Sequence, residues 1–212
     1  MYEDENEREY FESFEAYLKE ADYPKGKKKI MQAAVDLIST KSYNGTSTLQ
    51  IAKHAGLSQA TLFKYFKTKE DLLTAILHPI VPGLFGRFFE ELLAFNTTEE
   101  KVHYLVHNRM AYLKKNRALM KIILQEIFSN KKLRKEQLYI WNTLQDKLLV
   151  LHKELIADSR VNPEITVPQM VRICTGPLLA YFAQLYIVSD NSDIREEDLN
   201  LLEKQILGGL WK

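Results

Sequence analysis

The chain has 212 residues, of which 46% are apolar and 11% aromatic, and its formal net charge at pH 7 is +1. This length and apolar content suffice for one large domain or two small ones with a buried core, and they exclude a disordered or low-complexity protein. The one cysteine, Cys174, excludes an intramolecular disulfide framework and a cysteine-rich zinc module. Because the acidic N-terminus also lacks the features of a secretory signal, we expect a cytoplasmic protein.

Charge is distributed unevenly along the chain. Residues 1–24 hold nine acidic and two basic side chains, a net charge of −7, whereas residues 25–70 hold nine lysines and two acids, a net charge of +7. A basic block of this kind is typical of a surface that binds a polyanion. A solvated helical face without a partner is the alternative, and charge alone does not distinguish the two.

Apolar residues recur at helical spacing along most of the chain, so the expected fold class is all-α. An acidic amphipathic segment at residues 5–21 comes first and carries Tyr10, Phe11, Phe14 and Leu18 on one stripe. We expect this stripe to pack on the neighbouring domain or on a partner subunit.

The next three predicted helices have clear boundaries. The inner face of the second helix, residues 27–41, consists of Ile30, Ala33, Ala34, Leu37 and Ile38. The third helix begins at a capping box, in which the Ser47 hydroxyl accepts from the amide three residues on and Gln50 reaches back. Gly56 ends this helix, and Ser58 caps the fourth.

The fourth helix is too short to bury much surface. Its Leu62 and Phe66, four residues apart, are expected to face the same core. The side chains left around its rim and outer face are Gln59, Ala60, Thr61, Phe63 and Lys64. A fifth helix opens with Glu70 and Asp71, in the first turn, where the helix dipole favours acids.

Beyond residue 78 the predicted helices lengthen. We therefore predict three parts: an acidic helical extension at residues 1–24, a compact domain at 25–78 and a larger helical domain at 79–212. The most apolar stretch, residues 173–188, has 16 residues, fewer than the roughly 20 needed to cross a bilayer. We interpret it as a buried or interface helix and expect no association with a membrane.

The third and fourth helices, joined by a tight glycine turn, form a helix-turn-helix in which the second helix displays polar groups. The major groove of DNA is about 12 Å wide and admits one helix. The small residues Ala52, Ala55 and Gly56 let the two helices approach closely. This arrangement predicts binding to double-stranded DNA through the fourth helix.

Residues 28–75 resemble the DNA-binding domain of the tetracycline-repressor (TetR) family of bacterial regulators. The matching segments are IMQAAVDLI, GTSTLQIAKHAGLS and ATLFKYFKTKEDLL, which follow one another with continuous spacing. The resemblance implies that the DNA contacts of the recognition helix come from Gln59, Ala60, Thr61, Phe63, Lys64 and Tyr65. It also implies phosphate contacts from Ser47, Thr48 and Lys69.

Three positions depart from the family pattern. Phe63 stands where tyrosine is common, so a phenolic hydroxyl contact to phosphate is missing. Leu49 stands where arginine is often found, which weakens the case for base reading from the third helix. Ser42 stands where a helix-ending glycine is usual, so we expect a different shape for that turn.

The resemblance implies that the remaining helices form a domain that dimerises and binds an unknown small-molecule effector. We predict a homodimer through the two apolar C-terminal helices, residues 167–188 and 195–211. The alternative is that these helices only close the core of one chain. The side chains predicted to line a lipophilic effector site, on composition alone, are Phe89, Tyr104, His107, Tyr112, Phe128, Trp141 and Tyr181.

Glu100, His103 and His107 share one helical face, and Glu-x-x-His is half of a di-iron ligand motif. The full set needs a second such motif, which the sequence lacks, so we predict no metal site and no cofactor. No nucleophile elbow, phosphate loop or carboxylate pair indicates an enzyme. The predicted function is a homodimeric repressor that a small lipophilic effector releases from a palindromic operator. The alternative is a helical-bundle enzyme or carrier with a vestigial DNA-binding head.

Overall fold

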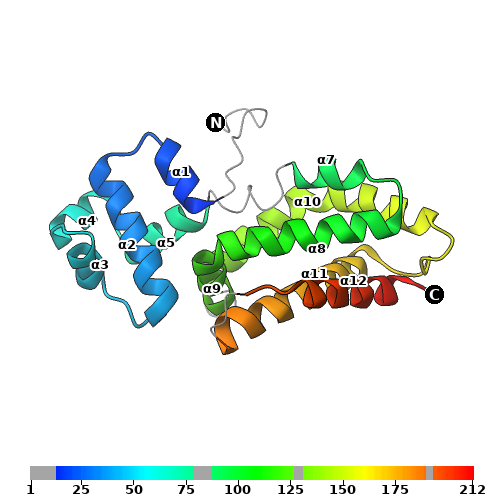
Figure 1. Cartoon of the computed structure of the whole chain (residues 1–212). Helices are drawn as coiled ribbons and strands as arrows, with labels where there is room; N and C mark the ends of the chain where they lie inside the picture. Colours follow the sequence, from blue (N-terminus) through cyan, green and yellow to red (C-terminus); the bar gives the residue numbers. More distant parts are fainter. Residues whose placement is uncertain (1–12, 79–86, 127–130, 190–192) are drawn as a thin grey trace. The chain divides into compact units, whose positions relative to one another are not determined.

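The computed structural model describes residues 13–78, 87–126, 131–189 and 193–212 (Figure 1). In the long helix that starts at residue 131, side chains are described from residue 144 onward. Within these ranges the chain forms helices and no β-strand, apart from one antiparallel bridge between Val161 and Trp211. The predicted all-α fold class is therefore confirmed.

The described helices differ in length along the chain, and those of the first 78 residues are mostly short. They are α1 (Phe14–Glu20), α2 (Lys25–Lys41), α3 (Thr48–His54), α4 (Gln59–Tyr65), α5 (Lys69–Leu77), α7 (Phe88–Leu93), α8 (Thr98–Lys115), α9 (Arg117–Glu126), α10 (Lys131–Ala157), α11 (Val167–Ala183), the π-helical turn η2 (Gln184–Val188) and α12 (Glu196–Leu210).

The chain divides into two compact units. The first comprises residues 1–87 and 118–133, and the second comprises residues 88–117 and 134–212. From helix length, all residues beyond 78 were predicted to form one domain. In the structure, α9 belongs to the same unit as the N-terminal helices. This grouping depends on contacts between distant parts of the chain, which helical spacing does not reveal.

In the first unit, α2 is the helix around which the core forms. Ile30, Met31 and Ile38 of α2 are completely buried, as are Ile51 of α3 and Leu62 of α4. Burial of each such aliphatic side chain contributes about 1.5–3 kcal/mol. Since α3 and α4 each span only seven residues, their stability comes from this shared core and not from their own hydrogen bonds.

Helix α1 is attached to the start of α2. Phe14 and Leu18, the described part of the predicted stripe, are buried, while Tyr10 and Phe11 lie outside the described residues. The ammonium of Lys28 donates to the carbonyl of Lys19 over 3.1 Å. The acidic segment and the basic block are therefore linked at this point.

In the second unit, α8 packs against α7, α11 and α12 (Figure 1). Helix α11 runs on into η2, so that residues Val167–Val188 form one helix of 22 residues, long and apolar enough to cross a membrane. Core helices of water-soluble proteins meet the same criterion. Only 28% of its most apolar stretch is buried within this chain, which leaves an apolar face uncovered.

The backbone at Ser42 adopts a conformation that favours glycine. Helix α2 ends there with φ 67° and ψ 164°. This region of backbone space is accessible almost only to glycine and costs another residue on the order of 1–3 kcal/mol. The turn thus keeps a glycine-like backbone although serine occupies the position, and the folded chain bears the strain.

Replacing Ser42 by glycine is expected to stabilise the protein by about 1 kcal/mol, because relief of the strain exceeds the added flexibility of the unfolded chain. The long hydrogen bond that the Gly45 amide donates to the Ser42 hydroxyl, at 3.3 Å, would be lost. Urea unfolding followed by circular dichroism measures the change. The matched variant Ser39→Gly, inside α2, should lower stability by about 0.5 kcal/mol. A lower stability for Ser42→Gly would contradict the assignment of strain.

Candidate nucleic-acid interface

The turn between α3 and α4 is built on Gly56. The glycine has φ +69°, its amide donates to the Lys53 carbonyl over 3.1 Å, and the Leu57 amide donates to the Ala52 carbonyl over 2.9 Å. These two bonds form a Schellman motif, which ends a helix with a left-handed residue. The motif turns the chain sharply enough for α4 to pack against α3.

Both helices of this motif begin at a side-chain cap. The Ser47 hydroxyl accepts from the Gln50 amide at 3.2 Å, and the Gln50 carboxamide accepts from the Ser47 amide at 2.8 Å. The predicted capping box is therefore confirmed. The Ser58 hydroxyl accepts from the Thr61 amide at 3.1 Å, which confirms the predicted cap of α4. Each cap contributes about 1 kcal/mol.

Helix α4 has one buried and one exposed side. Leu62 and Phe66 are buried, as their spacing predicted. On the opposite side Ala60 and Lys64 are exposed, and 45% of the Phe63 surface is accessible to solvent. An exposed aromatic ring beside a lysine, on a helix held by its other face, is suited to insertion into a groove.

Gln59 and Thr61 are held in place by hydrogen bonds. The Gln59 carboxamide donates to the Thr48 hydroxyl over 2.8 Å, so two predicted DNA-contacting side chains from α3 and α4 lie together. The hydroxyls of Thr61 and Ser58 are 2.9 Å apart and bonded. Both Gln59 and Thr61 are half-buried, so the start of α4 is organised before any partner binds.

Tyr65 packs back onto the protein. A Cβ atom at Gly26, near the start of α2, would lie 3.2 Å from the Tyr65 hydroxyl oxygen. The glycine therefore leaves room for the ring, which is half-buried. Tyr65 thus contributes to the attachment of α4 to α2, whatever contact its hydroxyl makes with a ligand.

Lys69, at the start of α5, is also engaged within the first unit. Its ammonium donates to the Tyr43 carbonyl and lies 3.9 Å from the centre of the Tyr43 ring. Burial lowers the pKa of Lys69, and the carboxyl of Glu126 in α9 opposes this shift. The ammonium holds the connection between α2 and α3 and retains two further N–H donors, which are compatible with the predicted phosphate contact.

Further lysines of the basic block are exposed around this motif. The exposed members are Lys25, Lys29, Lys41, Lys53, Lys64 and Lys67. Lys27 instead lies with its ammonium 3.5 Å from the centre of the Tyr23 ring. A short helix with an exposed face, flanked by exposed lysines, is the arrangement that reads a groove while neutralising phosphates.

Comparison with known proteins assigns this motif to a family. Residues 30–76 match the model of the bacterial regulatory proteins of the tetR family. Residues 30–76 therefore form a DNA-binding domain of the tetR type. The match covers the described helices α3 and α4 and most of α2 and α5. The TetR-type DNA-binding domain therefore coincides with the helix-turn-helix described above.

Individual curated relatives match part of the chain. The chain is 29% identical over 85 residues to the fatty acid metabolism regulator protein of Bacillus subtilis, a match that spans 40% of this chain and 44% of that relative. The shared sequence thus covers less than half of the relative's length.

Solved structures share the fold over most of the chain. A TetR family regulator from Marinobacter aquaeolei has a TM-score of 0.68 at 16% identity, covering 89% of this chain and 96% of its own. The regulator FadR from Bacillus subtilis, in complex with stearoyl-CoA, has a TM-score of 0.63 at 23% identity. The match covers 85% of this chain and 95% of the FadR chain. The helical second unit therefore has the fold that accompanies a TetR-type head.

Three predicted effector-site residues lie in one aromatic region of α7 and α8. The Phe89 ring contacts Phe88, and the Phe88 ring in turn stacks on Tyr104 with centroids 5.8 Å apart. The Arg109 guanidinium lies 3.9 Å from the centroid of the Phe88 ring and 5.3 Å from that of the Tyr112 ring. Burial lowers the pKa of Arg109 to about 10.

Arg109 was not among the residues predicted to line the effector site. Its position three residues before Tyr112 places the two side chains on the same side of α8, which was the available signal. Burial also raises the pKa of Tyr104 to about 12, with a further contribution from its bond to Glu91. The region therefore combines aromatic surface with a positive charge.

The other predicted effector-site residues are not in this region or are not described. His107 is bonded to Glu203 of α12, and the Tyr181 hydroxyl donates to the Asp198 carboxylate over 2.8 Å. Phe128 lies outside the described residues, and Trp141 lies in the part of α10 whose side chains are not described. Of the seven predicted residues, the structure brings together Phe89, Tyr104 and Tyr112.

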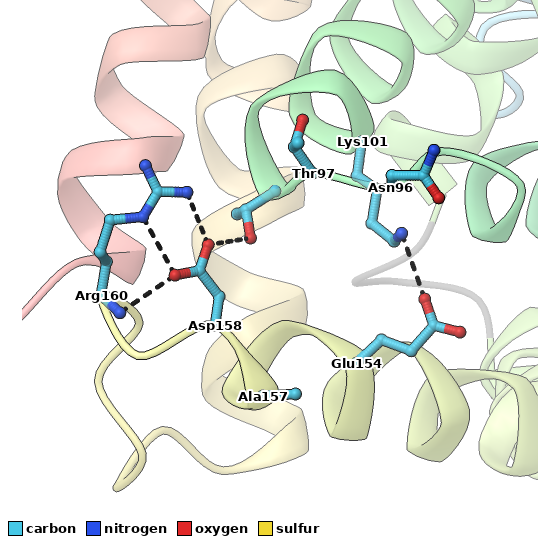
Figure 2. A pocket seen from close by; sticks show the side chains of 8 residues that line it. Asn96, Thr97, Lys101, Glu154, Ala157, Asp158 and Arg160 are labelled. Atoms are coloured by element: carbon cyan, nitrogen blue, oxygen red, sulfur yellow. Dashed lines mark hydrogen bonds and ion pairs between the residues drawn. The ribbon is translucent and has the colours of Figure 1, made fainter.

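A pocket of about 340 Å³ lies elsewhere in the second unit, between the start of α8 and the end of α10 (Figure 2). Figure 2 shows Lys101 paired with Glu154 and Arg160 bound to Asp158, with nitrogen–oxygen distances of 3.2 and 2.7 Å. The guanidinium also holds the pKa of Asp158 well below its usual range. The lining is polar and internally paired, so it does not suit a lipophilic ligand.

Substitution of Gly56 by alanine is expected to destabilise the first unit by about 1 kcal/mol, because φ +69° is unfavourable for a residue with a Cβ atom. No atom would obstruct that Cβ, so the backbone is the cause. The matched variant Gly56→Asn adds a larger side chain but tolerates this conformation and should lose less. Thermal unfolding compares the variants. A greater loss of stability in Gly56→Asn than in Gly56→Ala would contradict the explanation by backbone conformation.

Proposed function

We propose that this protein is a homodimeric transcriptional repressor that binds a palindromic operator through α4 and is released by a small lipophilic effector. The observation that carries the proposal is the TetR-type helix-turn-helix, whose α4 is anchored by Leu62 and Phe66 and presents Phe63 and Lys64 outward. Helices fixed in this way enter the major groove with their exposed residues on base edges and phosphates.

The proposed DNA contacts are those of the sequence prediction, with roles assigned by their surroundings. Lys64 neutralises phosphate from an exposed position. Gln59 reads a base edge if its bond to Thr48 opens or is shared, since a carboxamide pairs bidentately with adenine. The Ser47 amide already donates to Gln50, so this end of α3 contacts phosphate through its remaining amides.

Dimerisation is proposed through α11 and α12. Leu179 in α11 and Leu201 in α12 have 37% and 53% of their surface exposed, and Val188 at the end of η2 has 80%. Together with the weak burial of Val167–Val188, these side chains form an apolar surface that a second copy would cover. A two-fold axis would then present two α4 helices to successive major grooves.

The effector is proposed to be an amphiphile with a long apolar part, bound at the aromatic region of α7 and α8. Phe88, Tyr104 and Tyr112 supply apolar surface, and Arg109 supplies charge for an anionic group. A fatty acid metabolism regulator and a stearoyl-CoA complex among the relatives support this class. An effector lowers operator affinity if it binds more tightly to the conformation in which the two α4 helices do not fit successive major grooves. The decrease is set by the difference between its affinities for the two conformations.

The alternative, an enzyme or carrier with an unused head, receives no support from the comparisons. The relatives named above are regulators, and the described residues of the head retain both caps and the exposed face of α4. A cytoplasmic location follows from the proposed role, since the operator is chromosomal DNA.

Selection of random duplex DNA by the purified full chain should enrich a palindrome, because a two-fold dimer reads two equal half-sites. Lys64→Ala should weaken binding to that palindrome and reduce the slope of log affinity against log salt by about 1 for each lysine removed. The control Lys153→Ala removes an exposed lysine of the second unit and should bind as wild type. Absence of any enriched sequence, with the protein folded and dimeric, would reject the regulator function.

Analytical ultracentrifugation tests the dimer. The wild type should sediment at twice the chain mass, whereas the double variant Leu179→Glu, Leu201→Glu should sediment as a monomer, because four carboxylates per dimer would be buried without partners. Leu149→Glu, at a leucine of α10 with 40% exposure, is the control and should remain dimeric. A dimeric double variant would place the interface elsewhere.

A further inference from the structure

A cluster of two imidazoles and a carboxylate joins α8 to α12 in the second unit. His103 and His107, four residues apart, lie on one face of α8 with ring centroids 4.2 Å apart. The same Glu203 oxygen, Oε1, lies 2.8 Å from His103 Nδ1 and 3.2 Å from His107 Nε2. Three potential metal ligands from two helices therefore converge on one point.

The spacing of these three atoms suits a small divalent ion. All three lie within 4.8 Å of one another. Donor atoms around a tetrahedral zinc ion, at about 2.0–2.1 Å from the metal, are about 3.3 Å apart. An ion would enter the cluster after small side-chain rotations, with no movement of the helices.

A second carboxylate, and thus a fourth potential ligand, is within reach. Glu196, seven residues before Glu203 on α12, has Oε1 3.8 Å from His107 Nε2. Its side chain is mostly exposed, so it can turn toward an ion or leave the position to water. Two imidazoles with one or two carboxylates form a ligand set typical of Zn²⁺ and of neighbouring transition metals, whereas Mg²⁺ and Ca²⁺ prefer sites made only of oxygen.

The sequence analysis considered Glu100 together with His103 and His107 and predicted no metal site, whereas the structure places a different carboxylate beside the two histidines. The Glu100 carboxylate accepts from the amides of Asn96 and Thr97, at 3.2 and 3.0 Å, and thereby caps α8. It is occupied at the helix start and takes no part in the histidine cluster. Glu203, about a hundred residues further along the chain, stands in its place.

We propose that His103, His107 and Glu203 bind a divalent transition metal ion of the Zn²⁺ class, which cross-links α8 and α12. The ion would replace two hydrogen bonds by three coordinate bonds and so stabilise the packing of α12 on α8. The proposal concerns the second unit alone and does not depend on DNA binding. If α12 also forms the dimer interface, metal occupancy would stabilise the helix that the partner covers.

Isothermal titration calorimetry of the full chain with ZnCl₂, after treatment with a chelator and its removal, tests the site. One ion per chain is expected for the wild type. His103→Ala and Glu203→Gln should each weaken binding at least tenfold. His54→Ala is the matched control, since this exposed histidine also faces a carboxylate, Asp36 at 3.6 Å, but in the first unit. It should bind Zn²⁺ as wild type.

Thermal unfolding provides a second readout. Zn²⁺ should raise the midpoint of the wild type and of His54→Ala, and should not raise that of His103→Ala. His103 is 61% exposed, so its removal is not expected to unfold the chain. Equal Zn²⁺ affinity in the wild type, His103→Ala and Glu203→Gln would overturn the proposal. So would the absence of any binding, which would leave the cluster as two imidazole–carboxylate hydrogen bonds.

Discussion

The left-handed turn at Gly56 is the constraint on which the DNA-binding head depends. Helices of seven residues are not stable alone, so α3 and α4 exist because the turn folds them onto one core. The Schellman bonds around Gly56 end α3, and burial of Leu62 and Phe66 then fixes which side of α4 faces outward. Phe63 and Lys64 are exposed as a consequence of that anchoring.

The head also includes interactions that oppose local preference. Ser42 adopts a backbone conformation suited to glycine, and Lys69 is partly desolvated beside Tyr43. Both lie at or near the connection between α2 and α3, which precedes the predicted phosphate contacts of Ser47 and Thr48. The rest of the core, with Ile30, Ile38 and Ile51 completely buried, supplies the stability that offsets these costs.

The second unit uses α8 as its common element. One face of α8 carries Tyr104, Arg109 and Tyr112 toward the aromatic region, and another carries His103 and His107 toward α12. An effector at the first face and a metal ion at the second would therefore act on the same helix. Because α12 and α11 also expose apolar side chains, the position of α8 bears on both ligand binding and the proposed dimer contact.

The sequence alone determined the features that depend on residues within about one helical turn. The caps at Ser47 and Ser58 and the burial of Leu62 and Phe66 followed from spacings of three or four residues, which the helix geometry converts directly into contacts. The family pattern around Gly56 is equally local, and it indicated the DNA-binding head.

Only the tertiary structure decided the contacts between distant residues. They include the bond of Gln59 to Thr48, the contact of Lys69 with Tyr43, the burial of Arg109 among aromatic rings and the choice of Glu203 over Glu100 beside the histidines. Each depends on which faces of two helices meet and in what register, and spacing along one helix carries no information about its neighbour.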